Sequence, residues 1–176
     1  MAGRSDQGAI IVSGVDAFLG WLAERLPDLL IRLGNLETAW LAYDRENPAI
    51  DRPIYVTALA RSGTSILLEL LSTHPDVAFH RYKDFPCVHI PVWWNWFIER
   101  AGSKESVPVE RAHGDGIHVT PESPEAMEEI LYMAFFPHCH DPGFSNVLNA
   151  ETRHPAFEDF YRAHLQKLLT VRRRRR

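Results

Sequence analysis

Residues 54–71 read IYVTALARSGTSILLELL. The first part, residues 54–60, is rich in β-branched and apolar side chains and lies between Pro53 and Arg61, a pattern that predicts a β-strand. Residues 63–74 place leucine and isoleucine on one side and end at His74-Pro75, which predicts a helix. A strand, a short polar turn and a helix therefore follow one another.

The polar turn between them consists of Arg61, Ser62, Gly63, Thr64 and Ser65. In a glycine turn that opens a helix, successive backbone N–H groups converge on an anion, and the helix N-terminus adds to the attraction. Gly63 allows a close approach, while the hydroxyls and the arginine add donors. A turn without a ligand needs neither, so we interpret these five residues as a phosphate-binding loop.

The loop of nucleoside triphosphatases has the pattern G-x-x-x-x-G-K-[ST]. Over residues 58–65 the chain matches the second glycine and the final hydroxyl residue, but Ala58 replaces the first glycine and Thr64 the lysine. The missing lysine disfavours a magnesium-dependent triphosphatase. A kinase with a degenerate loop remains as an alternative.

Residues 55–78, YVTALARSGTSILLELLSTHPDVA, resemble the 5′-phosphosulfate-binding segment of the sulfotransferase family. That segment is a strand followed by G-x-P-R-S-G-T-T, a leucine-rich helix and often His-Pro-Asp-Val. The chain departs from it at Ala58, at Ala60, where the family has proline, and at Ser65, where it has threonine. The alanine at 58 restricts backbone angles that glycine would allow.

The resemblance implies a P-loop-like α/β fold of three layers with a parallel sheet. It also implies 3′-phosphoadenosine-5′-phosphosulfate (PAPS) as sulfuryl donor, a hydroxyl or amine acceptor and no metal. By match to the motif, the 5′-phosphosulfate would be held by Arg61, Ser62, Gly63, Thr64 and Ser65.

Sulfuryl transfer also needs a base for the acceptor proton. In several branches of the family the base is a glutamate or histidine soon after the loop helix. Here that region reads HRYKD, so Asp84 and His80 are the candidates, with Asp84 favoured because His80 could simply end a turn. The alternative for either residue is a surface ion pair with Arg81 or Lys83.

Other side chains allow two interpretations. Several aromatic residues could line an acceptor pocket for an apolar alcohol or could form core or subunit contacts: Phe85, Trp93, Trp94, Trp96 and Phe97. A second group could face the acceptor or belong to a polar loop: His113, Asp115 and His118. The cluster His138-Cys139-His140-Asp141 lacks a second ligand pair at zinc spacing, so we expect no metal site there.

The chain divides into three predicted parts. Residues 1–50 form a helical arm, with apolar residues at helical spacing over 15–42 and a break at Pro27. We expect the arm to cover the domain's own core, although a membrane surface or a second subunit, as in a homodimer, could also bind it. Residues 51–171 form the helix-rich α/β domain, with later helices near 93–100, 125–136 and 155–171, the second capped by Ser123. Residues 172–176 are an arginine tail.

Composition limits the class of protein. With 45% hydrophobic and 24% charged residues, the 176-residue chain suits one globular domain. The formal net charge is −4 and the arginine tail contributes +5, so residues 1–171 carry −9, which argues against nucleic-acid binding. The tail alone could be a nuclear-address or RNA-binding arm.

The sequence also indicates a compartment. The chain has only two cysteines, Cys87 and Cys139, and no evident signal peptide, which favours the cytoplasm. No apolar run is long enough to cross a bilayer.

One half of the expected donor site has no counterpart in the sequence. Sulfotransferases also bind the donor's 3′-phosphate through an arginine and a serine on a later strand and helix, and nothing after Ala78 resembles that unit. Only one buried strand is evident, whereas a parallel sheet needs several. We therefore expect an N-terminal, truncated portion of a sulfotransferase-like protein, which could be inactive. The alternative is a non-catalytic nucleotide- or phosphate-binding module.

Overall fold

The computed structural model describes residues 25–44, 48–59, 62–102, 107–110, 118–138, 141–143, 148–149 and 151–173. The helices are α2 (Pro27–Asp44), α3 (Thr64–Ser72), the 3₁₀ turn η1 (Tyr82–Asp84), α4 (Pro91–Ala101), α5 (Glu128–Phe135) and α6 (Pro155–Arg172). The strands β1 (Val109–Glu110) and β2 (His118–Val119) form one short antiparallel pair. Within the described residues this pair is the only sheet.

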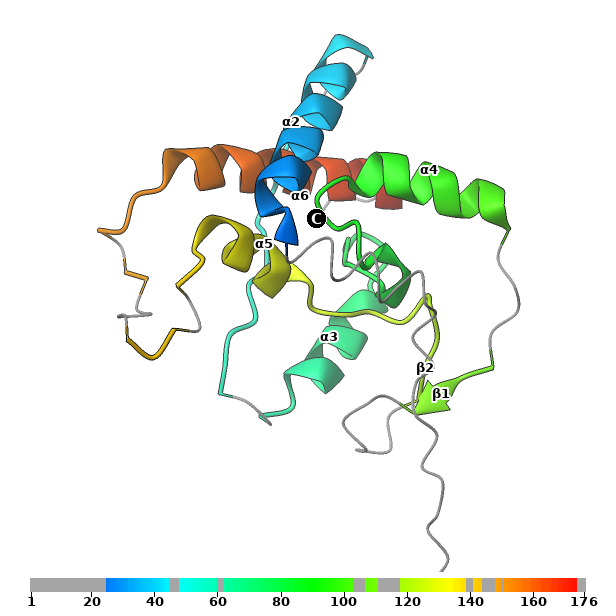
Figure 1. Ribbon diagram of the computed structural model, residues 1–176. Helices are drawn as coiled ribbons and strands as arrows, with labels where there is room; N and C mark the ends of the chain where they lie inside the picture. The colour runs from blue at the N-terminus through cyan, green and yellow to red at the C-terminus, as the bar shows by residue number, and fades with distance from the viewer. Residues whose placement is uncertain are drawn as a thin grey trace, which may run out of the picture.

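Helix α6 lies at the centre of the helical part. It contacts both α2 and α4, and Figure 1 shows it passing behind α2 and running beside α4. Apolar side chains that α6 shares with α5 and with the loop before α4 form the core, as burying them removes apolar surface from water. The buried cluster consists of Val88, Met127, Leu131 and Phe160, with Ile31, Ile130, Phe135 and Tyr161 packed against it.

Three of the predicted helices are confirmed by α2, α4 and α6. Helix α6 begins with Pro155 at its first position, where proline loses no hydrogen bond, and the His154 Nδ1 accepts the Phe157 N–H at 3.2 Å. Helix α5, in contrast, begins at Glu128, so the predicted start at Ser123 is wrong. The Ser123 hydroxyl instead accepts the Thr120 N–H at 2.9 Å within a turn.

The segment predicted as a β-strand, residues 54–60, forms no strand over residues 54–59, so that prediction is wrong for the described part of it. All six side chains are exposed, with Leu59 at 86%. The following helix is confirmed as α3, yet none of its residues is buried, and Leu70 is 67% exposed. Figure 1 shows α3 and the chain that leads into it below α4 and α6. Strand propensity without a pairing strand is not sufficient to form a sheet.

The described ends of the predicted arm and of the predicted arginine tail both pack with the helical core. Helix α2 contacts α5 and α6 and contributes the buried Leu30 and Leu41, so the described part of the arm belongs to the core. Arg172, predicted as the start of the tail, is the last residue of α6 and is 8% exposed. The parallel sheet of a three-layer fold stays a prediction, because residues 1–24, 45–47, 60–61 and the other gaps lie outside the described part.

Gly34 marks a close approach between α2 and α6. A Cβ at this position would lie 2.6 Å from the Phe160 Cε2 and 2.8 Å from the His89 carbonyl oxygen. Contacts this short force the helices apart, so a glycine is required here for space.

We therefore expect Gly34→Ala to lower the free energy of unfolding by about 1 to 2 kcal/mol, because overpacking outweighs the gain in helix propensity. Urea unfolding followed by circular dichroism measures the change. The matched control is Asn35→Ala, at the neighbouring exposed position of the same helix, which should be neutral or slightly stabilising. Equal effects of the two substitutions would contradict the close approach.

Candidate functional site

The described part of the predicted phosphate-binding loop begins at Ser62. Gly63 is the N-cap of α3 and adopts a left-handed conformation, with φ 86° and ψ 15°. A Cβ at this position would meet nothing within 4 Å, so glycine is needed for its backbone angles and the space beside it is open. Ser62 and Gly63 are exposed, and Thr64 and Ser65 are half-buried. The loop thus faces solvent at a helix N-terminus, while Arg61 lies outside the described residues.

The first turn of α3 supplies the backbone N–H groups of the predicted loop. The first helical hydrogen bond runs from the Leu67 N–H to the Gly63 carbonyl at 3.2 Å. The amides before Leu67 point out of the helix N-terminus, where the positive end of the helix dipole lies. This arrangement can attract a phosphate or sulfate group, as the sequence predicts.

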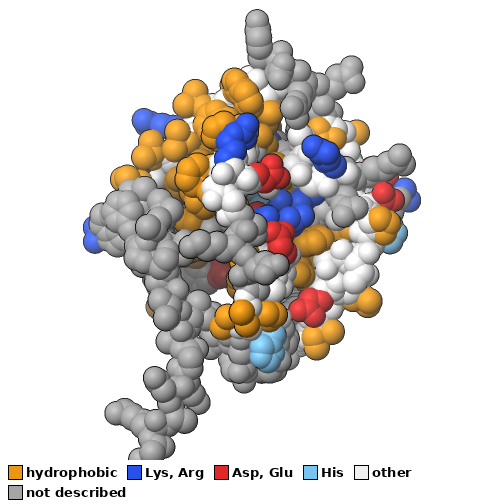
Figure 2. Space-filling model, turned by 90° about the vertical axis from the view of Figure 1, so that its right-hand side faces the viewer, with side chains coloured by type: hydrophobic (Ala, Val, Ile, Leu, Met, Phe, Trp, Pro, Cys, Tyr) orange, Lys and Arg blue, Asp and Glu red, His pale blue; other side chains and the backbone are white. Residues whose placement is uncertain are grey.

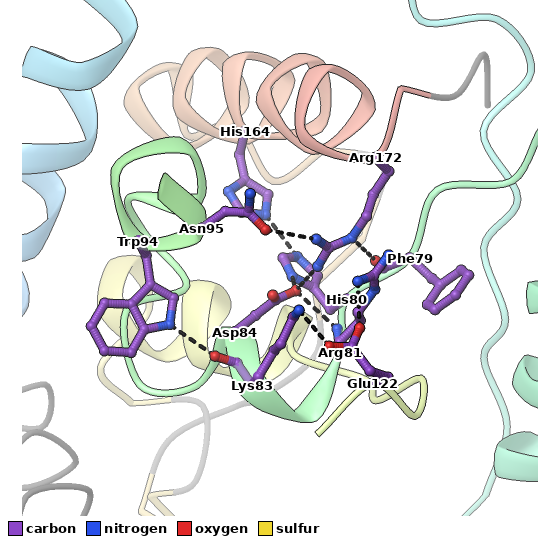
Figure 3. A network of polar contacts seen from close by, with 10 residues as sticks. All are labelled: Phe79, His80, Arg81, Lys83, Asp84, Trp94, Asn95, Glu122, His164 and Arg172. Carbon is purple, nitrogen blue, oxygen red and sulfur yellow. Dashed lines mark hydrogen bonds and ion pairs between the residues drawn. The ribbon is translucent and has the colours of Figure 1, made fainter. Parts of the chain in front are cut away.

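The two predicted bases, His80 and Asp84, are brought together but are buried. Their exposed fractions are 3% and 5%. Neither forms the surface ion pair that was the alternative, because Arg81 and Lys83 both pair with Glu122, each at 2.5 Å. The lysine and arginine therefore stay near the surface while His80 and Asp84 point inward (Figure 3).

The Asp84 carboxylate is the centre of a network of donors (Figure 3). Its Oδ2 accepts the Arg81 N–H at 2.9 Å, the His80 Nδ1–H at 3.2 Å and a short hydrogen bond from the Arg172 Nη2. Arg172 also donates to the Phe79 carbonyl at 3.1 Å and to an Asn95 side-chain oxygen at 3.4 Å. The network joins the last turn of α6 to the segment before α4.

These contacts determine the proton affinity of Asp84. Burial alone would raise its pKa, but the hydrogen bond from His80 and the positive charge of Arg172 outweigh burial and lower the pKa to about 2. A general base works best when its pKa lies near the working pH. The environment of Asp84 therefore favours a structural role, and its assignment as the base stays a prediction.

His80 is paired at both ring nitrogens. Because the Asp84 carboxylate accepts at Nδ1, neutral His80 presents a lone pair at Nε2, which lies 2.9 Å from the His164 Nε2. The rings are stacked with centroids 5.0 Å apart. The proton between them belongs to His164 in this arrangement, which leaves the His164 Nδ1 buried with no hydrogen-bond partner among the described residues. An acceptor could reach His80 only if His164 moved.

A second buried ion pair, between Glu37 and Lys167, was missed in the sequence. The Lys167 Nζ lies 3.1 Å from the Glu37 Oε2 and donates to the carbonyls of Gly34 and His89 at 3.1 and 3.3 Å. The Glu37 Oε1 accepts the Trp93 N–H in the first turn of α4 at 2.6 Å. This carboxylate therefore caps α4, where a negative charge is favourable.

The sequence of α6 contains an indication of these buried charged groups. Its buried face carries polar side chains among the apolar ones, at His164, Lys167 and Arg172. Lys167 and Arg172 follow His164 at spacings of three and eight residues, which place all three on one side of a helix. Charges at core positions need partners, so this spacing alone could have indicated buried acids elsewhere in the chain.

The described members of the remaining predicted groups do not form one site. Trp96 and Phe97 are each 55% exposed, and the Trp94 Nε1 donates to the Lys83 carbonyl at 2.8 Å. The His138 Nδ1 lies 3.9 Å from an Asp141 carboxylate oxygen. Among the described residues no cluster of three His, Cys, Asp or Glu could hold a metal ion. Outside that part of the chain lie Cys139, His140, His113 and Asp115.

A groove runs between α6 and the segment that leads toward the loop. Its volume is about 520 Å³, within the range of ligand pockets. None of the predicted pocket aromatics lines it. The lining residues are Ile50, Pro53, Tyr55, Phe157, Glu158, Tyr161, Arg162, Leu165 and Gln166.

Comparison of the chain with protein-family models, with curated proteins and with solved structures finds no match. The resemblance to sulfotransferases therefore depends on residues 55–78 alone. In the described part of the chain, no helix is both long and apolar enough to cross a membrane.

We expect Asp84→Asn to lower the free energy of unfolding by about 3 kcal/mol, because it leaves the buried Arg172 charge without its partner. The matched control is Glu122→Gln, which removes a carboxylate from the same region but from a partly exposed position. The control should cost less than about 1 kcal/mol. Urea unfolding at pH 7 compares them, and equal losses would contradict the buried network.

The low pKa of Asp84 also predicts a dependence on acid. A carboxyl group whose pKa falls from 3.8 to about 2 on folding stabilises the protein fully above pH 3.8. That contribution, of roughly 2 kcal/mol, is lost as the pH falls toward 2. The difference in unfolding free energy between the wild type and Asp84→Asn should therefore shrink between pH 4 and 2. A constant difference over this interval would show that Asp84 is not ionised in the network.

Proposed function

We propose that the chain binds the phosphosulfate end of PAPS through residues 61–65 and acts as a sulfotransferase-type protein. The observation that carries this proposal is the left-handed Gly63 at the exposed N-terminus of α3, inside the sequence Arg-Ser-Gly-Thr-Ser. The glycine conformation, the helix dipole and the hydroxyls all favour a compact anion. The absent lysine disfavours a magnesium nucleotide.

The residues present suit the 5′ end of the donor. The open space at Gly63 lets the backbone approach an anion closely, and the hydroxyls of Ser62 and Thr64 can donate to its oxygens. Arg61 would supply the fixed positive charge. When bound, PAPS would supply the sulfuryl group, and the loop's part is to hold it and to offset its negative charge.

A hydroxyl or amine acceptor completes the proposed reaction, with His80 or Asp84 as base. One observation favours a second candidate function, binding of the nucleotide without transfer. Both bases are buried, and His164 occupies the nitrogen of His80 that an acceptor would need. Binding and transfer are therefore tested separately.

Isothermal titration with 3′-phosphoadenosine-5′-phosphate, and with ATP plus magnesium, tests the ligand. We expect the bisphosphate to bind more tightly than ATP and without a metal. Arg61→Ala should weaken binding by at least about tenfold, because it removes charge-assisted hydrogen bonds. The control Arg52→Ala, at an exposed arginine paired with Asp51, should leave the affinity within about twofold. Tighter, magnesium-dependent binding of ATP would overturn the proposal.

Transfer of radiolabelled sulfate from PAPS to a panel of phenols, alcohols and amines tests the reaction. Label on an acceptor, lost in His80→Gln, would support the sulfotransferase and His80 as its base. Binding of the bisphosphate with no label on any acceptor would assign the chain to the binding-only function.

A further inference from the structure

Helix α6 carries two buried cations and one buried neutral histidine on the face that contacts the rest of the core. Lys167 pairs with Glu37 of α2, and Arg172 pairs with Asp84 at the end of η1. His164 lies about one turn before Lys167 on the same helix and is 1% exposed. The two cations and two anions balance, so the cluster is neutral only while His164 is uncharged.

The surroundings of His164 leave no place for another positive charge. Segment 79–84 contributes His80 and, behind it, Asp84, whose Oδ2 already accepts three donors. The loop before α4 contributes His89, both of whose ring nitrogens are buried without a partner among the described residues. Helix α6 itself contributes Lys167 and Arg172, and Glu37 of α2 is bound to Lys167. The aromatic neighbours Phe160 and Tyr161 supply no charge at neutral pH.

We propose that the His80–His164 pair is an acid-sensitive latch, in which one added proton drives α6 away from segment 79–84. The gap of 2.9 Å between the two Nε2 atoms holds a single proton. A second proton either enters that gap, and breaks the contact, or binds the His164 Nδ1, which has no acceptor to receive its hydrogen bond. In both cases an uncompensated charge is buried, and a buried unpaired charge is costly enough to displace a helix.

The direction of the pH effect follows from linkage. Burial first, and then the neighbouring His80 and Lys167, hold the pKa of His164 well below 6.5, and burial with Lys167 lowers that of His89 to about 4. The unfolded chain takes up these protons near pH 6.5 and the folded chain does not. The folded state is therefore stable above pH 6.5 and loses stability as the pH falls below it.

The Glu37 carboxyl group changes the stability of the fold with pH in the opposite direction. Its pKa is raised by burial, against the attraction of Lys167, so the folded state takes up this proton more readily than the unfolded chain. The pH dependence of the unfolding free energy is therefore the sum of opposing contributions. A comparison between the wild type and a variant that changes only His164 separates them.

His164→Gln is the matched variant, because the glutamine amide can still donate to the His80 Nε2 but does not titrate. We expect the ratio of wild-type to variant unfolding constants to rise about 30-fold between pH 7.5 and 5.0, which is one proton over 1.5 pH units below 6.5. Urea unfolding followed by tryptophan fluorescence measures it, since Trp94 contacts Lys83 of η1. The control His74→Gln, at an exposed histidine, should leave the ratio within about twofold. A constant ratio for His164→Gln would overturn the proposal.

Two measurements on the unaltered protein keep the proposal testable if His164→Gln does not fold. Nitrogen-15 NMR of the imidazole rings should show His164 neutral at pH 6, and titration near pH 6.5 in the intact fold would overturn the latch. Hydrogen exchange at pH 7.5 and 5.0, corrected for intrinsic rates, should show a larger decrease of protection in α6 and segment 79–84 than in α2. Equal loss in all helices would show general acid unfolding instead of release of α6.

Discussion

The ion pair between Arg172 and Asp84 is the constraint on which the arrangement of the core helices depends. A charge removed from water is tolerated only when other groups replace its hydration. Arg172 meets this condition with three different acceptors, and Asp84 with three different donors. A shift of α6 by one residue would leave both charges unpaired, so the apolar contacts of α6 are restricted to one register. Glu37 and Lys167 impose the same condition on α2 and α4, about one and a half turns earlier in α6.

The conformation of the predicted phosphate-binding loop has a different physical origin from that of this core. Its conformation comes from one glycine and one short helix, and none of the α3 residues is buried. Hydrophobic side chains also remain on the face shown in Figure 2, beside the charged groups of the surface. The candidate ligand site therefore depends on local backbone geometry, whereas the candidate bases belong to the packed core. The two halves of the proposed chemistry are thus subject to separate structural constraints.

Local signals in the sequence were sufficient for most helices. The apolar period predicted α6, and the leucine-rich run predicted α3. The Ser123-Pro124 pair failed as a helix start because the serine hydroxyl is used within a turn, an alternative that side chains of this type always offer. The strand failed because pairing is a property of two segments, and residues 54–59 have strand propensity but no paired strand in the described structure.

The candidate site was predictable only where its structure depends on residues adjacent in the sequence. The position of Gly63 follows from the adjacent residues, but the burial of Asp84 depends on Arg172, 88 residues later in the chain. Sequence proximity suggested Arg81 or Lys83 as partner, and both bind Glu122 instead. A charged residue at a core position of a helix was the available indication, since such a residue requires an opposite charge that the local sequence does not contain.

The exposed segment 54–59 has a consequence for the behaviour of the protein in concentrated solution. The six residues IYVTAL contain no charge, proline or glycine, and short segments of this composition readily associate into intermolecular β-structure. Natural proteins flank such segments with charged gatekeepers or cover them. Here the neighbouring charges are Asp51, Arg52 and Arg61, two of one sign and one of the other. The net positive charge at the ends of this segment is then the main opposition to aggregation, and it weakens as salt screens it.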